Sequence, residues 1–499
     1  MTTALINHFI SGAETAGESD RTQPVYNPAT GAVSGNLRLA DKADLDRTVA
    51  AARAAANSWG ETSLATRTAV LFKFRELVAA HVDELAERVT AEHGKVLSDA
   101  RGEIARGLDV IEFSCGIPTL LKGDYSDQVS TGIDVFSFRE PLGVVAGITP
   151  FNFPVMVPLW MAPMAIATGN AFILKPSSRV PSAAMLLARL WKDAGLPDGV
   201  FQVLHGNREV VSGLLTHPDV DGISFVGSTP VAQHITEVAT AHGKRVQALG
   251  GAKNHAIVMP DADLDNAADH LAAAAFGSAG QRCMAISVAV AVGDAADLLV
   301  KKIEERALAI KVDNGTAPGA DMGPVISSDS RHFILKTVTE AEQEGATLVV
   351  DGRDLVVRGH EKGFWVGPTV IDHVKTQMSA YTEEIFGPVL VVVRVEDLEA
   401  GIALINANPY GNGTAIFTTS GANARKFQRS VDVGMIGINV PLPVPVAYHS
   451  FGGWKASLFG DKHIYGPEGV SFYTRGKVVT SRWPEPSHAS GASYNFPSN

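Results

Sequence analysis

Residues 277–285, GSAGQRCMA, contain Cys283, one of two cysteines in the chain, directly after Arg282. Thiolate is the nucleophilic form of cysteine, and an adjacent cation favours it. Attack on an aldehyde would give a hemithioacetal, and loss of hydride would then give a thioester. The alternative is a small buried hydrophobic residue, the usual role of a free cysteine. We interpret Cys115, in VIEFSCGIP, in that way.

Asn152, in ITPFNFP at 148–154, is a second candidate for the same chemistry. Its side-chain amide and the backbone N–H of Cys283 could together hold a developing oxyanion. The alternative is an ordinary turn residue between two prolines. Arg282 adds a third function: a buried guanidinium is costly without a partner, and a substrate carboxylate would be a natural one.

FVGSTPV at 225–231 is a candidate anion site. A strand leads through Gly227 and Ser228 into a helix start, where backbone N–H groups favour negative charge. The same residues also make an ordinary helix cap, and this alternative stays open. The G-x-G-x-x-G fingerprint is absent from the strand–helix units described below, which weakens a simple Rossmann assignment.

Length and composition limit the function classes. A chain of 499 residues predicts two or more domains, and 45% apolar with 19% charged residues indicates a globular protein. The net charge of −11 and the lack of a dense Lys/Arg run argue against nucleic-acid or anionic-membrane partners. We find no secretory signal and no disulfide framework, so we expect a cytoplasmic protein with free thiols and without a metal site.

Residues 141–174 carry no charge and are long enough for a membrane helix. Prolines at 150, 154, 158 and 163 interrupt this stretch, so we predict a strand, a turn, a buried helix and a second strand.

The elements that must position these residues follow a repeated pattern. The first forty residues are turn-rich, and helical periodicity covers 41–91 and 97–121. From 144 to 249, strands alternate with helices, which predicts a parallel sheet covered on both faces, with ligands at the carboxyl ends of its strands. A second such block runs from 254 to about 460. Residues 124–145, and GVSFYTRGKVVTSRW after Tyr465, alternate like edge strands.

Six motifs together resemble the aldehyde dehydrogenase superfamily: ITPFNFP, KPSS, FVGST, LGGAK, GQRC and EIFGPV. The resemblance runs from about residue 5 to 482. GAKNH, AGQRCMA and VSFYT resemble its CoA-acylating branch, the methylmalonate-semialdehyde (malonate-semialdehyde) dehydrogenases. The resemblance implies an α/β fold with two Rossmann-related doubly wound domains and a small β oligomerisation arm. The expected parts are a cofactor domain (1–123 and 146–253), a catalytic domain (254–463), the arm (124–145 and 464–485) and a tail (486–499), loose or draped over a partner subunit.

The resemblance implies roles for individual residues. Cys283 would be the nucleophile and Asn152 an oxyanion donor. Lys175 would lie near the adenosine ribose, where the alternative is a solvated strand end. Glu384 would hold the nicotinamide ribose, where the alternative is a local cap. The full set of expected cofactor residues is Thr149, Phe151, Lys175, Ser178, Arg179, Gly227, Ser228, Gly250, Glu384 and Phe386.

Two positions depart from the superfamily pattern. Ser178 stands where NAD-preferring members typically have Glu, and Arg179 could pair with a 2′-phosphate. We expect NAD, as in the acylating branch, with NADP left open. Leu249 stands where hydrolytic relatives carry the general base, and leucine cannot accept a proton. The thioester should therefore await CoA rather than water.

Arg106 matches the second carboxylate-binding arginine of this branch; on sequence alone it would be a surface helix residue. The resemblance therefore implies NAD-dependent, CoA-acylating oxidation of methylmalonate or malonate semialdehyde. Decarboxylation would follow, to propionyl-CoA or acetyl-CoA, in valine or inositol catabolism. We expect a homotetramer built as a dimer of dimers. Two alternatives stay open: a hydrolytic NAD(P)-dependent aldehyde dehydrogenase of another semialdehyde, and a non-enzymatic nucleotide-binding scaffold.

Overall fold

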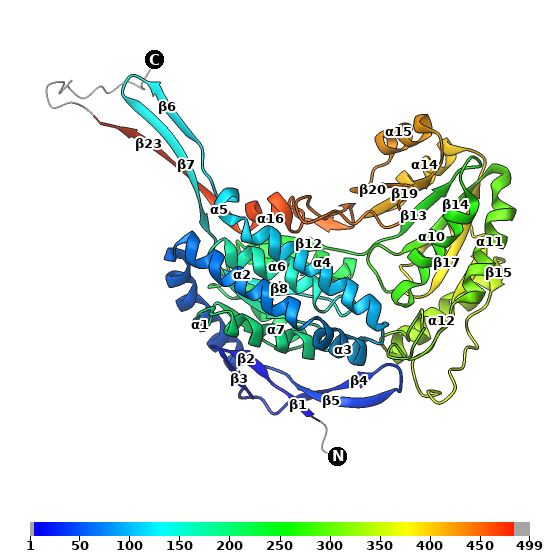
Figure 1. Cartoon of the computed structure of the whole chain (residues 1–499), viewed down its shortest axis with the longest axis horizontal. Helices are drawn as coiled ribbons and strands as arrows, with labels where there is room; N and C mark the ends of the chain where they lie inside the picture. Colours follow the sequence, from blue (N-terminus) through cyan, green and yellow to red (C-terminus); the bar gives the residue numbers. More distant parts are fainter. Residues whose placement is uncertain (1–3, 484–499) are drawn as a thin grey trace.

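Two large sheets dominate the computed structural model, which describes residues 4–483 (Figure 1). The five central strands of the first sheet are mutually parallel, and the order along the chain reverses between β8 and β11. Such a reversal opens a crevice at the carboxyl ends of the strands. The sheet order is β22 (Leu458–Phe459), β12 (Arg245–Leu249), β11 (Gly222–Val226), β8 (Val144–Ile148), β9 (Ala171–Lys175), β10 (Phe201–Val203), β2 (His8–Ile10) and β3 (Ala13–Thr15).

Alternate residues of these strands enter two different cores. Phe172 and Leu174 pack on one face of the sheet, whereas Ala171 and Ile173 pack on the other. Because both faces are buried, the strands are largely apolar, which is why they were predicted with near-correct bounds. Helices α6 (Met156–Ala167) and α7 (Ser182–Asp193) lie on the first face under α2 (Leu64–Ala80), α3 (Val82–His93) and α4 (Leu97–Cys115). Helices α1 (Lys42–Glu61), α8 (Arg208–Thr216) and α9 (Thr229–Ala241) cover the other.

The second sheet has the order β15 (Thr347–Val350), β16 (Thr369–Asp372), β17 (Val389–Val395), β14 (Ile286–Val292), β13 (Asn254–Val258), β19 (Gly413–Phe417) and β20 (Met435–Ile438). Only its edge strand β15 is antiparallel. Around it pack α10 (Leu264–Phe276), α11 (Ala296–Ala309), α12 (Ser328–Gln343), α14 (Leu398–Ala407) and α15 (Gly421–Ser430). The predicted α/β fold with two doubly wound sheets is confirmed.

The uncharged stretch 141–174 forms β8, α6 and β9, as predicted, inside the first core. Across residues 4–483, every helix is either too short or too polar to cross a membrane.

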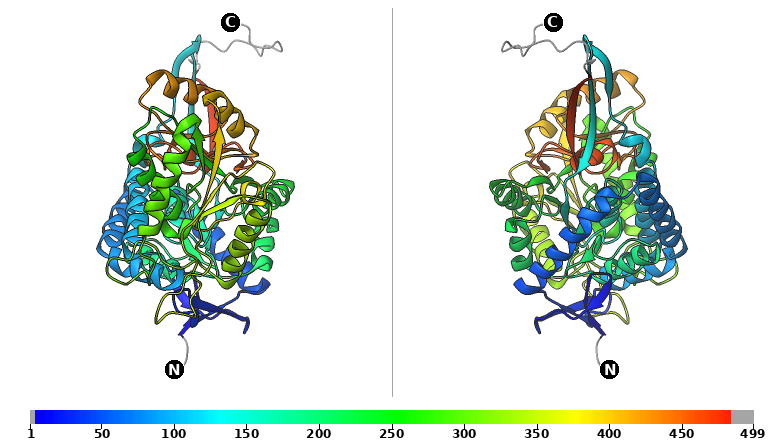
Figure 2. Two further views of the ribbon diagram at one scale, coloured as in Figure 1. Left: turned by 90° about the vertical axis from the view of Figure 1, so that its right-hand side faces the viewer. Right: turned by 90° about the vertical axis from the view of Figure 1, so that its left-hand side faces the viewer.

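A three-stranded arm projects from the body and places β7 (Ile133–Pro141) between β6 (Tyr125–Ser130) and β23 (Thr474–Arg482) (Figures 1 and 2). The strand prediction for residues after Tyr465 was wrong over its first part, which forms helix α16 (Gly466–Phe472). Pro467 in the first turn suits a helix start, and the helix buries Val470 and Phe472. The expected tail, 486–499, lies outside the described residues.

The turn-rich N-terminus contains short strands that sequence periodicity did not reveal. Strands β2 and β3 extend the first sheet, while β1 (Ala4–Ile6), β5 (Ala32–Arg38) and β4 (Thr22–Asn27) form a separate small sheet. Three-residue strands are too short to show a period of two.

Candidate active site

A pocket of about 560 Å³ lies at the carboxyl ends of the first sheet, where the strand order reverses. The loops after β8, β9, β11 and β12 supply most of its wall, because parallel strands end at one edge. The pocket brings together all ten residues expected to bind the cofactor: Thr149, Phe151, Lys175, Ser178, Arg179, Gly227, Ser228, Gly250, Glu384 and Phe386.

Several polar groups in this pocket have no protein partner. Lys175 is 9% exposed, and its ammonium forms no hydrogen bond or ion pair within residues 4–483. Burial lowers the pKa of Lys175 to about 8. The hydroxyl of Thr149 is also buried and unpaired. Ser228 is the N-cap residue of α9, but its side chain accepts no backbone N–H, so the capping explanation does not account for it. These groups suit a polar ligand with anionic and hydroxyl groups.

Glu384 reaches the same pocket from the second sheet, five residues before β17. Its carboxylate accepts the Ala252 N–H at 2.9 Å, and burial raises its pKa. A Cβ at Gly251 would lie 2.3 Å from this carboxylate, so a larger residue there would displace the Glu384 side chain. Phe386, at a left-handed φ of 51°, meets the Phe151 ring edge-on at 5.8 Å. Such strained backbone often marks a ligand site.

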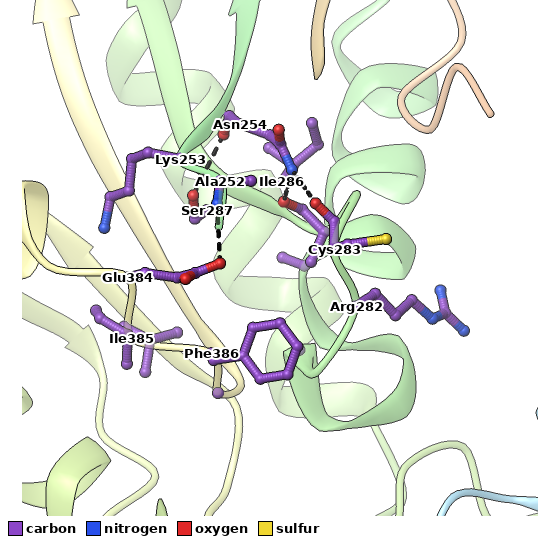
Figure 3. A pocket seen from close by; sticks show the side chains of 15 residues that line it. Ala252, Lys253, Asn254, Arg282, Cys283, Ile286, Ser287, Glu384, Ile385 and Phe386 are labelled. Atoms are coloured by element: carbon purple, nitrogen blue, oxygen red, sulfur yellow. Dashed lines mark hydrogen bonds between the residues drawn. The ribbon is translucent and has the colours of Figure 1, made fainter. Parts of the chain in front are cut away.

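Cys283 lies between this pocket and a second one, and it lines both. It precedes β14, so it approaches the first sheet from the amino end of the second. Two buried amides hold its main chain. The Asn254 side chain donates to the Cys283 carbonyl at 2.9 Å (Figure 3), and the Asn412 side chain donates to the same carbonyl at 3.0 Å. The preceding turn places Ser278 and Ala279 at φ values of 56° and 52°. This loop is therefore held in one geometry by contacts from outside it.

Arg282 favours the thiolate, as expected, but its effect is outweighed by burial. Burial, reinforced by the Glu384 carboxylate, raises the pKa of Cys283 to about 12. Backbone N–H groups and Arg282 lower it, with Arg282 the weakest of these influences. Desolvation dominates because it acts on the thiolate directly, whereas the guanidinium is engaged elsewhere. The thiol is protonated in this state of the protein.

Asn152 lines the first pocket at 4% exposure, in the turn between β8 and α6. Its side-chain amide makes no hydrogen bond within the described residues, whereas its main-chain carbonyl accepts from Lys95 Nζ at 2.6 Å. The amide is therefore available to a ligand next to Cys283.

The second pocket, of about 280 Å³, lies on the other side of Cys283, between α4, α6 and the loop before β21 (Trp454–Lys455). Arg106 and Arg282, the two expected carboxylate-binding residues, both line it. The rest of its wall is largely apolar, formed by Phe153, Met156, Trp160, Met284, Leu442, Val444 and Phe451. Two arginines in an apolar pocket suit a short ligand with one carboxylate.

Arg282, for which a substrate carboxylate is the expected partner, also has a partner within the protein. Its Nη2 forms a short ion pair with Asp99 of α4. Arg106 pairs with Asp109 at 3.1 Å and donates to the Pro445 carbonyl at 2.7 Å. Both guanidinium groups are thus held in place by the protein, and each retains further N–H groups that no described residue accepts.

Within residues 4–483, every carboxylate that lines a pocket beside Cys283 has a protein partner. Leu249 ends β12 and packs in the first core at 3% exposure. Among described residues, the carboxylates lining pockets that include Cys283 are Asp99, Glu103 and Glu384. Asp99 binds Arg282, Glu103 binds Lys95, and Glu384 binds Ala252. Residues 4–483 also contain no cluster of three or more His, Cys, Asp or Glu suited to a metal ion.

The sequence did not reveal several residues that hold the site in place. They are Lys95, Asp99, Glu103, Asn254 and Asn412. Asp99 and Glu103 precede Arg106 by seven and three positions, a spacing that places all three on one face of α4. That spacing was visible in the sequence. Their partners, far away in the chain, were not.

Comparison with known proteins agrees with this geometry. The sequence model of the aldehyde dehydrogenase family matches residues 15–479. A malonate-semialdehyde dehydrogenase of Pseudomonas aeruginosa is 53% identical over 494 residues, covering 99% of both chains. The human mitochondrial methylmalonate-semialdehyde/malonate-semialdehyde dehydrogenase [acylating] is 47% identical, covering 96% of this chain and 89% of its own. A Sinorhizobium meliloti crystal structure complexed with NAD, described as a methylmalonate-semialdehyde dehydrogenase, has a TM-score of 0.96 and 48% identity, covering 97% and 99% of the two chains.

Proposed function

Because this chain belongs to the aldehyde dehydrogenase family, we propose that it oxidises malonate or methylmalonate semialdehyde and transfers the acyl group to CoA. The observation that carries the proposal is the position of Cys283. It lines a polar pocket suited to a dinucleotide and an apolar pocket with two arginines suited to a short acid. The names of the two enzymes compared above, from Pseudomonas aeruginosa and human mitochondria, give malonate or methylmalonate semialdehyde as their substrates.

The first half-reaction uses Cys283 and Asn152. The Cys283 thiol loses its proton and attacks the aldehyde carbon, and the carbonyl electrons move to oxygen. The Asn152 amide and the Cys283 backbone N–H donate to this oxyanion, each contributing about 3 kcal/mol of transition-state stabilisation. Loss of hydride from the same carbon leaves a thioester on Cys283. Because burial raises the thiol pKa, the proton must pass to solvent as the bond to the aldehyde carbon forms.

The residues of the first pocket fit a nicotinamide dinucleotide, which supplies the hydride acceptor when bound. Lys175 and Thr149 offer unpaired polar groups to it, and the start of α9 offers backbone N–H groups. Glu384 would accept ribose hydroxyls.

We propose NAD as the cofactor, as in the S. meliloti complex, although the residues near Ser178 do not repel a 2′-phosphate. Ser178 accepts from Gln23 at 3.3 Å, and Arg179 donates to Ser327 at 3.1 Å. A comparison of kcat/KM for NAD and NADP tests this proposal, and a higher value for NADP would contradict it.

Release of the acyl group follows from what surrounds Cys283. Leu249 is buried in the core and offers no base for water. The CoA thiolate then attacks the thioester carbon, and the Cys283 thiolate leaves. With a β-carboxylate on the acyl group, the C–C bond to that carboxylate breaks, and its electrons enter the thioester enolate. Protonation of the enolate completes formation of acetyl-CoA or propionyl-CoA, with loss of carbon dioxide.

We further propose the cytoplasm as the setting, valine or inositol catabolism as the pathway, and a homotetramer as the assembly. Both cysteines are free, as reducing conditions require. The three-stranded arm exposes Tyr125 and Val478, at 63% and 68%, which supports association through the arm.

The test is NADH formation from malonate semialdehyde with and without CoA, together with product identification. We expect sustained turnover only with CoA, and acetyl-CoA as the product. Sustained turnover without CoA would instead support a hydrolytic aldehyde dehydrogenase. No NADH under either condition, from any aldehyde tested, would overturn the proposal and favour a non-catalytic nucleotide-binding protein.

A further inference from the structure

Lys95 and Glu103 form a fully buried ion pair behind the turn that carries Asn152. Lys95 lies between α3 and α4, and Glu103 is in α4; Nζ and Oε2 are 2.7 Å apart, and both side chains are 0% exposed. Removing two charges from water is costly, and the cost is recovered only when further hydrogen bonds satisfy both groups.

All of these further bonds reach one segment. Lys95 Nζ donates to the Asn152 carbonyl at 2.6 Å. Glu103 Oε1 accepts the backbone N–H groups of Val155 and Met156 at 2.8 and 3.1 Å. The ion pair thus holds the turn from Asn152 to the start of α6 at both of its ends. The Lys95 ammonium also lies 4.4 Å from the centre of the Phe153 ring, within the same turn.

The Asn152 side chain depends on this support. Its amide makes no hydrogen bond within the described residues, so the residue is held by the hydrogen bond to its main-chain carbonyl. An oxyanion donor must be held within about 0.5 Å of the productive position. Lys95 lines neither the cofactor-side nor the substrate-side pocket, so it acts on the reaction through Asn152.

We propose that Lys95 and Glu103 are positioning residues that hold the Asn152 amide toward the oxyanion formed at Cys283. This inference rests on the proposed function. A pair that only stabilised the fold would also reduce activity when changed, so the test must separate the two roles.

A double-mutant cycle on the first-turnover rate of NADH formation does so. We expect Asn152→Ala to lower this rate by about 10²- to 10³-fold. Lys95→Gln, which misplaces the amide, should lower it by about 10- to 100-fold. The double variant should be no slower than Asn152→Ala alone, because the residue through which Lys95 acts is gone. Multiplication of the two effects in the double variant would overturn the inference.

A second readout is the alkylation rate of Cys283 by iodoacetamide, which needs no oxyanion donor. It should change less than about twofold in Lys95→Gln, whereas a general disturbance of the site would change it further. Arg101→Ala is the matched control, since Arg101 is a cation of α4, the helix of Glu103, and its partner is the exposed Asp83. It should leave both rates unchanged.

Lys95→Gln leaves Glu103 buried without a cation, so a second variant guards against unfolding. Lys95→Gln/Glu103→Gln replaces the pair with two neutral amides and should show the same loss of first-turnover rate and the same epistasis. If neither variant folds, the pair contributes stability rather than positioning, and the inference is overturned. Failure of the proposed function is a different result: wild-type protein would then form no NADH at all.

Discussion

Cys283 and Arg282 are adjacent in the chain but have different partners. Arg282 extends to Asp99 of α4, whereas Asn254 (Figure 3) and Asn412 hold the Cys283 main chain. The thiol is left in a desolvated position where its pKa is high. Its reactivity therefore depends on a base and a bound substrate rather than on a preformed thiolate.

The thiol pKa predicts the pH profile of alkylation in the free protein. Between about pH 6 and 9, far below a pKa of about 12, the thiolate fraction rises tenfold per pH unit. The iodoacetamide rate constant should rise in parallel without a plateau. Cys283→Ser measures the background from Cys115, whose pKa burial raises to about 11. A plateau near neutral pH would contradict this and show that nearby cations outweigh burial in setting the pKa of Cys283.

The two arginines of the substrate-side pocket predict a selective effect on acidic aldehydes. Arg282→Leu and Arg106→Leu should each raise KM for malonate semialdehyde by about 10- to 100-fold, the cost of one charged hydrogen bond, and change KM for propanal little. Arg282→Leu strands the Asp99 carboxylate, so Asp99→Asn/Arg282→Leu is the matched control. An equal loss on both aldehydes would rule out carboxylate recognition.

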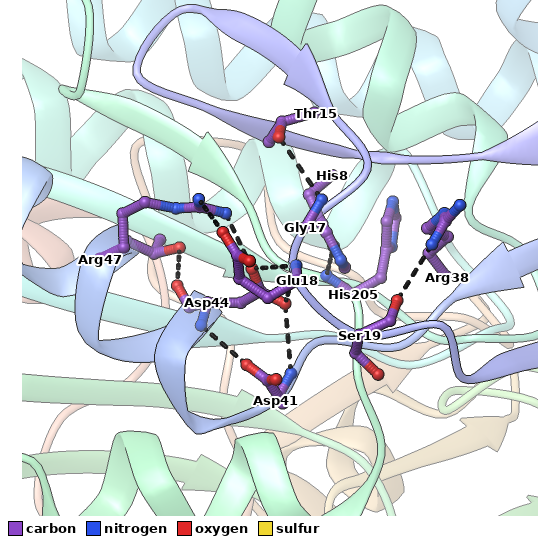
Figure 4. Close-up of polar contacts among 11 residues, drawn as sticks. His8, Thr15, Gly17, Glu18, Ser19, Arg38, Asp41, Asp44, Arg47 and His205 are labelled. Carbon is purple, nitrogen blue, oxygen red and sulfur yellow. Dashed lines mark hydrogen bonds and ion pairs between the residues drawn. The ribbon is translucent and has the colours of Figure 1, made fainter.

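At the scale of elements, strand β2 pairs with β10 at the edge of the first sheet, and a hydrogen bond between two buried histidines, His8 and His205, supports this pairing (Figure 4). His8 Nδ1 accepts the His205 N–H at 3.1 Å, which requires an unprotonated nitrogen. Burial lowers the pKa of His8 to about 4 and that of His205 well below its usual value. Both rings are therefore neutral in the folded protein at neutral pH.

This pair predicts a loss of stability in acid. Between pH 6.5 and about 4, the unfolded chain binds a proton at each histidine that the folded chain does not. Stability should therefore fall with pH across this window, by up to about 3 kcal/mol for His8 at its lower end. His8→Asn retains an acceptor for the His205 N–H and should make the melting temperature less dependent on pH. An unchanged dependence would exclude His8 as a cause.

Sequence patterns predicted the elements that bury both faces, such as β8, α6 and β9. They failed where elements are short or set by tertiary contacts, as in the three-residue strand β2 and in α16, whose residues alternate but pack as a helix. The same limit applied to the site. Motifs identified Cys283, Asn152 and Glu384, but pairing between Arg282 and Asp99 joins residues 183 positions apart, which local spacing does not reveal.

At the scale of the whole molecule, the site forms where the carboxyl ends of the strands of the first sheet face the amino ends of the strands of the second. The carboxyl ends of the first sheet supply Thr149, Lys175 and Gly227, whereas segments just before β14 and β17 supply Cys283 and Glu384. The cofactor pocket and the nucleophile thus come from different halves of the chain. Changes in how the halves pack should affect the chemistry as strongly as changes to the residues themselves.

The arm predicts how the molecule assembles. Val478→Asp replaces an exposed apolar side chain of strand β23 with a charge and should shift the mass measured by sedimentation toward smaller species. Leu308→Asp is the matched control, because Leu308 is equally exposed, at 67%, but lies on α11 away from the arm. Unchanged mass in Val478→Asp, or the same shift in both variants, would refute association through the arm.

The central claim is that the acyl group on Cys283 waits for a thiol and not for water. Its most direct test is the intact mass of the protein after mixing with NAD and malonate semialdehyde in the absence of CoA. We predict one acyl adduct per active site, located on Cys283, that persists after NADH formation has stopped and disappears when CoA is added. Continued NADH formation without CoA, with no adduct accumulating, would contradict the account.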